Sequence, residues 1–203
     1  MRAIELKTGT QLAVEEDANR GQHGGTIWDA GLVLAHALAT PEMNKRLRGR
    51  VVELGAGTGL VGIAAAACAP VHVTTTDLPE LVDLMRKNIA RNETLHADAK
   101  LDAAELCWGD ALPAGMVADV VLAADVMYDE GDTEKLASTL LDFIGRTPSC
   151  LIVMTHELRT QSPACFRVLQ ACGLRVSQAP DSWLDPDWRS ADIRCFVIDK
   201  APP

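Results

Sequence analysis

A glycine run that follows an acidic residue is the part of the sequence best suited to hold a ligand. Residues 51–62 read VVELGAGTGLVG, in which Glu53 ends an apolar run just before the glycines. A glycine turn between a strand and a helix lets a ligand approach the backbone, and the helix N-terminus favours an anion. Residues 57–62 also match the G-x-G-x-x-G pattern of dinucleotide-binding loops, although this match alone is weak.

Two further acids help to decide which ligand this loop holds. Asp77 follows the next apolar run, where an acid accepts hydrogen bonds from ribose hydroxyls in a dinucleotide and in a nucleoside alike. Glu53 stands ahead of the turn, where a carboxylate repels a pyrophosphate and attracts a cationic amino group. Asp125 ends a later apolar run on the same side of the expected sheet. Together these acids favour S-adenosylmethionine, which carries ribose and an α-amino acid but no phosphate.

From residue 50 onward, strand-like runs alternate with segments of helical period, and this pattern predicts an α/β fold. These strands and helices must position the three acids. We expect a Rossmann-like seven-stranded, mostly parallel sheet with helices on both faces, and a loop or single helical turn between 108 and 118. Expected strands cover 50–54, 72–76, 101–108, 118–125, 149–156, 174–179 and 193–200. Expected helices cover 60–68, 77–92, 133–145 and 162–173, the third ending at Gly145.

The first 49 residues are less regular, with an expected short hairpin around residues 8–10 and an apolar helix over 26–38 that carries Trp28. We interpret residues 1–203 as a single domain in which residues 1–49 form an N-terminal extension packed on the core. The basic stretch Lys45 to Arg50 is interpreted as a solvated helix end.

Composition and charge narrow the classes of function. A net charge of −9 argues against binding of nucleic acid and favours a basic partner. Apolar runs are too short for a membrane span, and no secretory signal is visible at the start, so we expect a cytoplasmic or nuclear protein. The six cysteines form no C-x-x-C pair, so we expect no metal site and thiols that serve as small core residues.

Five segments together resemble the seven-β-strand (class I) protein-lysine methyltransferases. They are TIWDAG, VVELGAGTGLVGI, TDLPELVDLMRKN, CWGD and ADVVLAADVMYDE, within a similarity that runs from about Gly25 to Lys200. The branch they resemble modifies chaperones, valosin-containing protein and translation factors. The TDLPEL segment and the D-x-x-Y pattern from Asp125 to Tyr128 are the most specific parts, and THELR at 155–159 is similar to the family's E-x-R ending.

The resemblance implies a set of residues around S-adenosylmethionine. Trp28 would lie near the methionine end, Asp77 would take the ribose, and Trp108 and Ala124 would border the adenine. The full set of implied cofactor-binding residues is Trp28, Glu53, Gly55, Ala56, Gly57, Thr58, Asp77, Leu78, Trp108 and Ala124.

The resemblance also implies that the substrate is a lysine of a protein and that Asp125 and Tyr128 act on it. The acidic charge of the chain favours a basic context for this lysine. Deprotonating a lysine at pH 7 costs roughly 4.6 kcal/mol, and a carboxylate alone makes this harder. We therefore assign Asp125 to capture and alignment of the amine, and Tyr128 to the wall of the channel and a hydrogen bond to the amine. His156 could be a base, but a lone histidine at a strand end is more often packed or hydrogen-bonded.

Three alternatives stay open at the level of the sequence. The chain could methylate another nucleophile, such as a protein histidine or a small amine. It could be a non-catalytic module that binds the cofactor and docks on a partner. It could also be a nicotinamide-dependent oxidoreductase, which binding of NAD would reveal.

Overall fold

A seven-stranded sheet forms the centre of the computed structural model, which describes residues 1–21, 23–69, 71–95 and 99–202. Its strand order is β5-β4-β3-β6-β7-β9-β8. The strands β3 to β7 pair in parallel, whereas β9 runs antiparallel to both β7 and β8. The strand bounds are β3 (Arg50–Leu54), β4 (His72–Asp77), β5 (Lys100–Glu105), β6 (Val120–Ala124), β7 (Leu151–Glu157), β8 (Leu174–Gln178) and β9 (Ile193–Lys200). The predicted fold class is confirmed.

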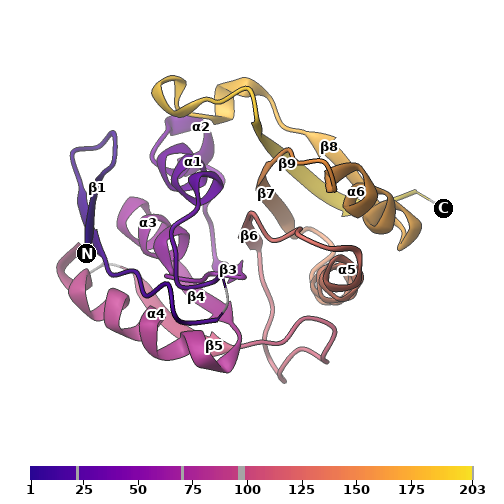
Figure 1. Ribbon diagram of the computed structural model, residues 1–203, viewed down its shortest axis with the longest axis horizontal. Helices are drawn as coiled ribbons and strands as arrows, with labels where there is room; N and C mark the ends of the chain where they lie inside the picture. Colours follow the sequence, from indigo (N-terminus) through magenta and orange to yellow (C-terminus); the bar gives the residue numbers. More distant parts are fainter. Residues whose placement is uncertain (22, 70, 96–98, 203) are drawn as a thin grey trace.

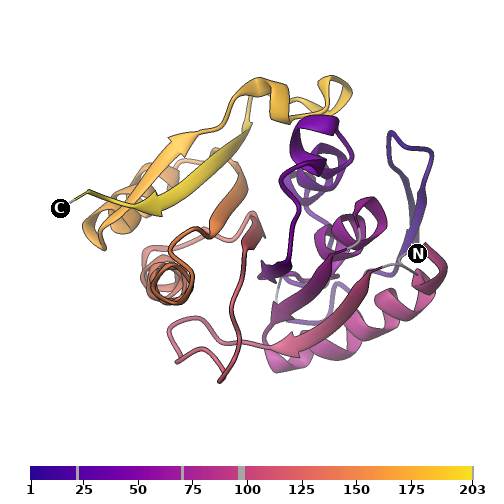
Figure 2. The same ribbon diagram turned by 180° about the vertical axis from the view of Figure 1, so that it is seen from behind.

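Helices cover both faces of the sheet (Figures 1 and 2). The helices α1 (Asp29–Leu38), α3 (Leu60–Cys68) and α4 (Pro79–Arg91) lie on one face, and α5 (Glu130–Arg146) and α6 (Ser162–Ala171) on the other. Strand β6 shows why both faces are apolar: Val120 and Leu122 pack into the core under α1 and α3, while Val121 and Ala123 pack into the core under α5 and α6.

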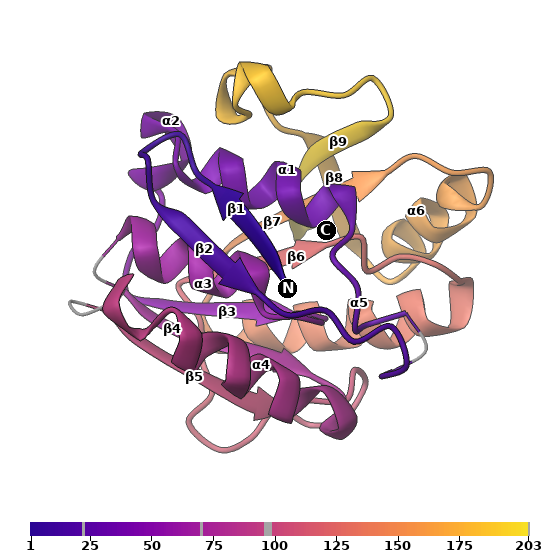
Figure 3. The same cartoon turned by 60° about the vertical axis from the view of Figure 1, so that its left-hand side comes forward.

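The N-terminal hairpin is present as predicted, with β1 (Arg2–Glu5) antiparallel to β2 (Gln11–Val14). Figure 3 shows it beside α3 and α4. Two amide side chains tie it there: Asn92 Oδ1 accepts a hydrogen bond from Ala13 N at 2.9 Å, and Asn88 Oδ1 accepts one from Glu15 N at 2.8 Å. The hairpin thereby covers the apolar side of the α3 layer, and Leu12 is fully buried.

A long connection between β8 and β9 also covers α1, which the sequence did not indicate. It holds the short helices η2 (Asp181–Trp183) and η3 (Pro186–Trp188). The Trp188 ring stacks on His36 of α1 with centroids 3.8 Å apart. Arg46, which follows the short helix α2 (Pro41–Asn44), lies 4.0 Å above the Trp183 ring. Arg46 is thus partly packed, whereas Lys45, Arg48 and Arg50 are exposed, as the interpretation of a solvated helix end predicts.

Several predicted boundaries need correction; helix α5, for example, begins at Glu130 rather than at residue 133. Trp28 is not inside α1 but caps it in an extended conformation, because its carbonyl already accepts the N–H groups of Gly31 and Leu32. Helix α5 passes Gly145 and ends at Arg146, because Gly145 adopts no left-handed conformation that would end a helix. Strand β5 ends at Glu105, ahead of Trp108. Residues 106–119 form a loop, as expected, and no described helix is long and apolar enough to cross a membrane.

Candidate functional site

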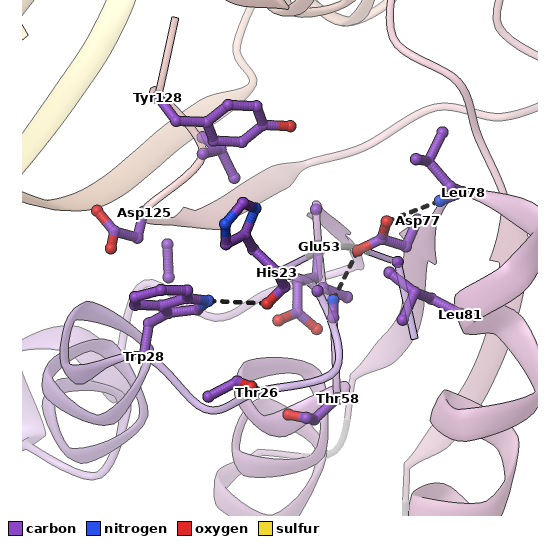
Figure 4. Close-up of a pocket in the computed structure, with 18 of the residues that line it drawn as sticks. His23, Thr26, Trp28, Glu53, Thr58, Asp77, Leu78, Leu81, Asp125 and Tyr128 are labelled. Atoms are coloured by element: carbon purple, nitrogen blue, oxygen red, sulfur yellow. Dashed lines mark hydrogen bonds between the residues drawn. The ribbon is translucent and has the colours of Figure 1, made fainter. Parts of the chain in front are cut away.

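A cavity of about 810 Å³ lies at the carboxyl ends of β3, β4 and β6. In open parallel sheets, ligands bind at this edge, beside the point where the strand order reverses. All the residues predicted from the sequence line this cavity: Trp28, Glu53, Gly55, Ala56, Gly57, Thr58, Asp77, Leu78, Trp108, Ala124, Asp125 and Tyr128. In Figure 4, Tyr128 and Asp125 border one side of the cavity, Asp77 and Leu78 another, and Glu53 its floor.

The glycine turn after β3 needs glycine for two separate reasons. Gly55, Gly57 and Gly59 all have positive φ, at 61°, 56° and 80°, a region that other residues enter only with strain. At Gly57, a side chain would also meet the backbone carbonyl of Gly24 at 2.5 Å. The turn is therefore packed against the segment that precedes α1, and its free side faces the cavity.

Asp77 holds this turn in place from the end of β4. Its Oδ2 accepts a hydrogen bond from Gly57 N, and its Oδ1 accepts one from Leu78 N, each at 2.7 Å. Burial raises the pKa of Asp77, and the two N–H groups oppose the rise. Because each carboxylate oxygen can accept a second hydrogen bond, Asp77 can still receive hydroxyl groups from a ligand.

Glu53 lies on the floor of the cavity at the N-terminus of α3. Its Oε2 accepts a hydrogen bond from Gly62 N at 2.8 Å, and the residue is 3% exposed. Burial raises the pKa of Glu53 to about 8 although the Gly62 N–H opposes the rise, and the nearby Asp77 carboxylate adds to it. The acid is thus poised to become charged when a cation approaches through the cavity.

Aromatic side chains frame the opening of the cavity. Trp108 and Tyr128 lie with their ring centroids 6.3 Å apart, and Tyr128 is 53% exposed. Burial and the carboxylates of Asp132, Asp77 and Asp129 raise the pKa of Tyr128 to about 12, so its hydroxyl keeps its proton at neutral pH. On the opposite side, Trp28 donates a hydrogen bond from Nε1 to the carbonyl of His23 at 3.1 Å (Figure 4).

The segment before Trp28 is a part of the site that the sequence reasoning missed. His23, Gly24 and Thr26 line the cavity, and Gly25 pairs its backbone with Asp17 and Arg20. A side chain on Gly25 would lie 1.8 Å from the Asp17 carbonyl. The paired glycines at 24 and 25 were the available signal, because adjacent glycines mark a close approach of two backbone segments.

Asp125 is more enclosed than the sequence suggested. Its backbone has φ 57°, the one described non-glycine residue with positive φ, and its side chain is 4% exposed. Arg159 donates from Nη1 to Oδ1 at 2.6 Å and from Nη2 to Oδ2 at 2.5 Å. Burial raises the pKa of Asp125, but the nearby His156 ring and the hydrogen bonds from Arg159 outweigh it and lower the pKa to about 2. An incoming amine therefore meets a charged carboxylate that is already paired.

His156 is packed rather than open to the cavity. It is fully buried, with Nε2 2.7 Å from Ser162 Oγ and Nδ1 3.3 Å from Asp125 Oδ1. A base must reach the proton that it removes, and a buried ring behind Asp125 does not. The structure therefore supports His156 as a packed, hydrogen-bonded residue rather than as a base.

Acidic residues surround the mouth of the cavity. Glu80, Asp129 and Asp132 line it, with Lys135 as a nearby cation that pairs with Asp132 at 2.8 Å. Asp129 also caps α5 by accepting a hydrogen bond from Asp132 N at 2.8 Å. These acids thus stabilise a helix N-terminus and make the mouth negative at the same time. Across the described parts of the chain, no three His, Cys, Asp or Glu side chains are placed to hold a metal ion.

Comparison with known proteins defines the class to which this fold and site belong. The glycopeptide N-methyltransferase MtfA, solved in complex with S-adenosylmethionine, has a similar fold, with a TM-score of 0.59 and 14% identity over 83% of this chain and 94% of that one. A family model described as lysine methyltransferase matches residues 6–170. The chain belongs to this lysine methyltransferase family, as the resemblance predicted.

Curated relatives carry the comparison further. Protein-lysine methyltransferase METTL21E of Bos taurus is 38% identical over 165 residues, which cover 78% of this chain and 57% of the relative. Protein N-lysine methyltransferase METTL21A of Xenopus tropicalis is 31% identical over 150 residues, which cover 74% and 68% of the two chains. The matched region of this chain thus spans less than two thirds of the length of the bovine relative.

Proposed function

We propose that this protein transfers a methyl group from S-adenosylmethionine to the side-chain amine of a lysine in a protein substrate. The observation that carries the proposal is the meeting of Glu53, Asp77 and the glycine turn in one cavity, with Asp125 and Tyr128 beside it. Membership of the lysine methyltransferase family supports the choice of nucleophile. A dinucleotide fits less well, because a pyrophosphate at the turn would meet the carboxyl groups of the buried Glu53 and the partly buried Asp77.

The cavity has the polar groups that this cofactor needs. Asp77 can accept the ribose hydroxyls, and Glu53 can pair with the α-amino group once it loses its proton. At Gly55, a side chain would fall 2.8 Å from Val126 and 2.9 Å from Trp108, so the turn packs closely against these two side chains. When bound, the cofactor supplies an electrophilic methyl group on a positively charged sulfur, and the chain itself supplies no covalent partner.

The residues of the chain then act by alignment and exclusion of water. Trp28 and Tyr128 present large exposed rings on opposite sides of the opening, where they can enclose a lysine side chain. The Tyr128 hydroxyl keeps its proton and can hydrogen-bond a neutral amine in either direction. Asp125 is assigned to alignment of the amine through the acceptor capacity that Arg159 leaves free.

The partner that suits the mouth is a lysine in a basic context. Glu80, Asp129 and Asp132 carry more negative charge than Lys135 offsets, and the whole chain has a net charge of −9. Such a field attracts basic segments and repels nucleic acid. The bovine and Xenopus relatives are both named as protein-lysine methyltransferases, which agrees with a protein as the substrate.

Labelling of a fractionated proteome with isotopically labelled S-adenosylmethionine tests the proposal. We expect label on lysine side chains of one or a few proteins, identified by mass spectrometry, with the wild-type protein and not with the Asp77→Ala variant. Label on histidine or on a small amine would assign the same cofactor to a different nucleophile. Absence of label together with tight binding of the cofactor would indicate the non-catalytic module.

A further inference from the structure

Arg159 encloses Asp125 more completely than a surface ion pair would. Its guanidinium binds both oxygens of Asp125, and Nη2 also donates to Glu157 Oε2 at 2.6 Å. The guanidinium carbon lies 5.9 Å from the centre of the Trp28 ring. Arg159 lines the cavity, so the pair stands beside the place where the amine must arrive. Contacts on three sides hold the fork in one orientation.

This arrangement bears on the protonation of a lysine that enters. A carboxylate without a partner would stabilise the ammonium form and raise the pKa of the lysine, which opposes transfer. A guanidinium bound to that carboxylate cancels most of its charge while leaving oxygen lone pairs to accept a hydrogen bond. A carboxylate paired in this way can align an amine without holding the proton on it.

The other charged groups around this position do not replace Arg159. Glu157 shares the guanidinium and adds negative charge, and His156 is buried behind Asp125. The remaining titratable groups that line the cavity are His23 before α1, Glu53 on β3, Asp77 on β4, Glu80 on α4, Cys107 after β5, Tyr128 after β6, and Asp129, Asp132 and Lys135 at α5. Lys135 is paired with Asp132, so within the described residues Arg159 is the cation that contacts Asp125 directly.

We propose that Arg159 is a positioning residue for the transfer proposed above: it fixes Asp125 and cancels its charge, so that the substrate lysine is aligned without being kept in its ammonium form. The inference rests on the proposed function and adds a role for the arginine of the E-x-R ending. It predicts that the apparent pKa of the substrate lysine rises when Arg159 loses its charge and falls when Asp125 loses its charge.

Four variants and one control test this role with the substrate protein identified by the labelling experiment. Arg159→Gln removes the cation, Asp125→Asn removes the anion, and the double variant removes both. Arg159→Lys keeps the charge without the fork. Arg175→Gln is the matched control, because Arg175 makes the same two-pronged pair with Asp199, both contacts 2.8 Å, at the β8–β9 edge. The pH dependence of single-turnover methylation gives the apparent pKa of the lysine.

We expect Arg159→Gln to raise this apparent pKa by about one unit, since it removes a charge of the same sign as the ammonium from its immediate surroundings. At pH 7 this corresponds to a transfer about tenfold slower. Asp125→Asn should lower the apparent pKa, and the double variant should return it close to the wild-type value. Arg159→Lys should restore most of the wild-type profile, and Arg175→Gln should leave it unchanged.

NMR titration of the target lysine bound together with S-adenosylhomocysteine reads the same pKa without turnover. Equal pKa values in the wild type, Arg159→Gln and Asp125→Asn would overturn the proposal, even if the rates fell. If Arg159→Gln did not fold, Asp125→Asn alone would decide, because an unchanged or higher pKa there contradicts the inference. Failure of the wild-type protein to methylate any lysine would instead overturn the proposed function.

Discussion

Asp77 Oδ2 accepts a hydrogen bond from Gly57 N at 2.7 Å, and this contact ties the acid at the end of β4 to the glycine turn after β3. The sequence predicted Asp77 as a ribose ligand and the glycines as a ligand cradle. The structure adds that the acid positions the cradle, since its other oxygen is anchored by Leu78 N. A ligand bound here would depend on Asp77 both directly and through the shape of the turn.

Asp77→Ala should weaken binding of S-adenosylmethionine by on the order of 1.5 to 3 kcal/mol, because it removes a charge-assisted acceptor. Isothermal titration calorimetry measures this loss. Asp83→Ala is the control, since Asp83 is an exposed acid on the neighbouring helix α4, where it pairs with Arg86. Unchanged affinity in Asp77→Ala would remove this residue from the site.

Gly57→Ala should destabilise the protein by about 1 kcal/mol or more and weaken cofactor binding, because the new methyl group needs a positive φ and meets the Gly24 carbonyl. Gly145→Ala makes the same chemical change inside α5, where nothing lies within 4 Å. That control should be neutral or stabilising by up to about 1 kcal/mol. Thermal unfolding of both variants checks the contrast, and an equal loss at the two positions would contradict it.

The strands, the helices and the acids at the strand ends could be predicted because they depend on local patterns. Alternation of helical and strand periods sets the α/β order, and the carboxyl ends of parallel strands meet at one edge, which brings Glu53, Asp77 and Asp125 together. These features need only the sequence period and the chirality of the crossovers.

What could not be predicted depends on contacts between distant parts of the chain. The pairing of Asp125 with Arg159 spans 34 residues, and the approach of Gly24 to Gly57 spans two separate segments. The stacking of Trp188 on His36 likewise requires the β8–β9 connection to return over α1. No local period specifies such contacts, so the enclosure of Asp125 and the role of the segment before Trp28 emerged only from the structure.

Glu53→Gln should change stability in a way that depends on pH. Burial holds the pKa of Glu53 at about 8 in the folded protein, above its ordinary value of 4.5. Glu53 therefore contributes stability that is fully present below about pH 4.5 and is lost as the pH rises towards 8. Glutamine does not ionise, so the variant does not lose stability in this way. Without cofactor, the melting temperature of the variant minus that of the wild type should therefore rise between pH 5 and pH 8.

The same variant should bind S-adenosylmethionine more weakly, because glutamine offers no charge to the α-amino group. Differential scanning calorimetry and titration calorimetry separate the two effects. Glu105→Gln at the exposed end of β5 serves as the control. It should change neither the pH dependence of the melting temperature nor the affinity for the cofactor. A constant difference in melting temperature across this pH range would mean that Glu53 is already charged in the folded protein.

Asp125→Asn should preserve the shape of the site and most of the cofactor affinity while it removes the charge that binds Arg159. Transfer to lysine should fall at least tenfold at pH 9, equivalent to about 1.4 kcal/mol or more. At this pH the protonated fraction of the substrate lysine differs less between the variant and the wild type than at pH 7. Tyr128→Phe should be milder, since it keeps the ring beside Trp108 and loses only the hydroxyl. Single-turnover rates and cofactor affinities measured side by side distinguish catalysis from binding. Full activity of Asp125→Asn on the same lysine would make Asp125 a residue that only stabilises the turn after β6.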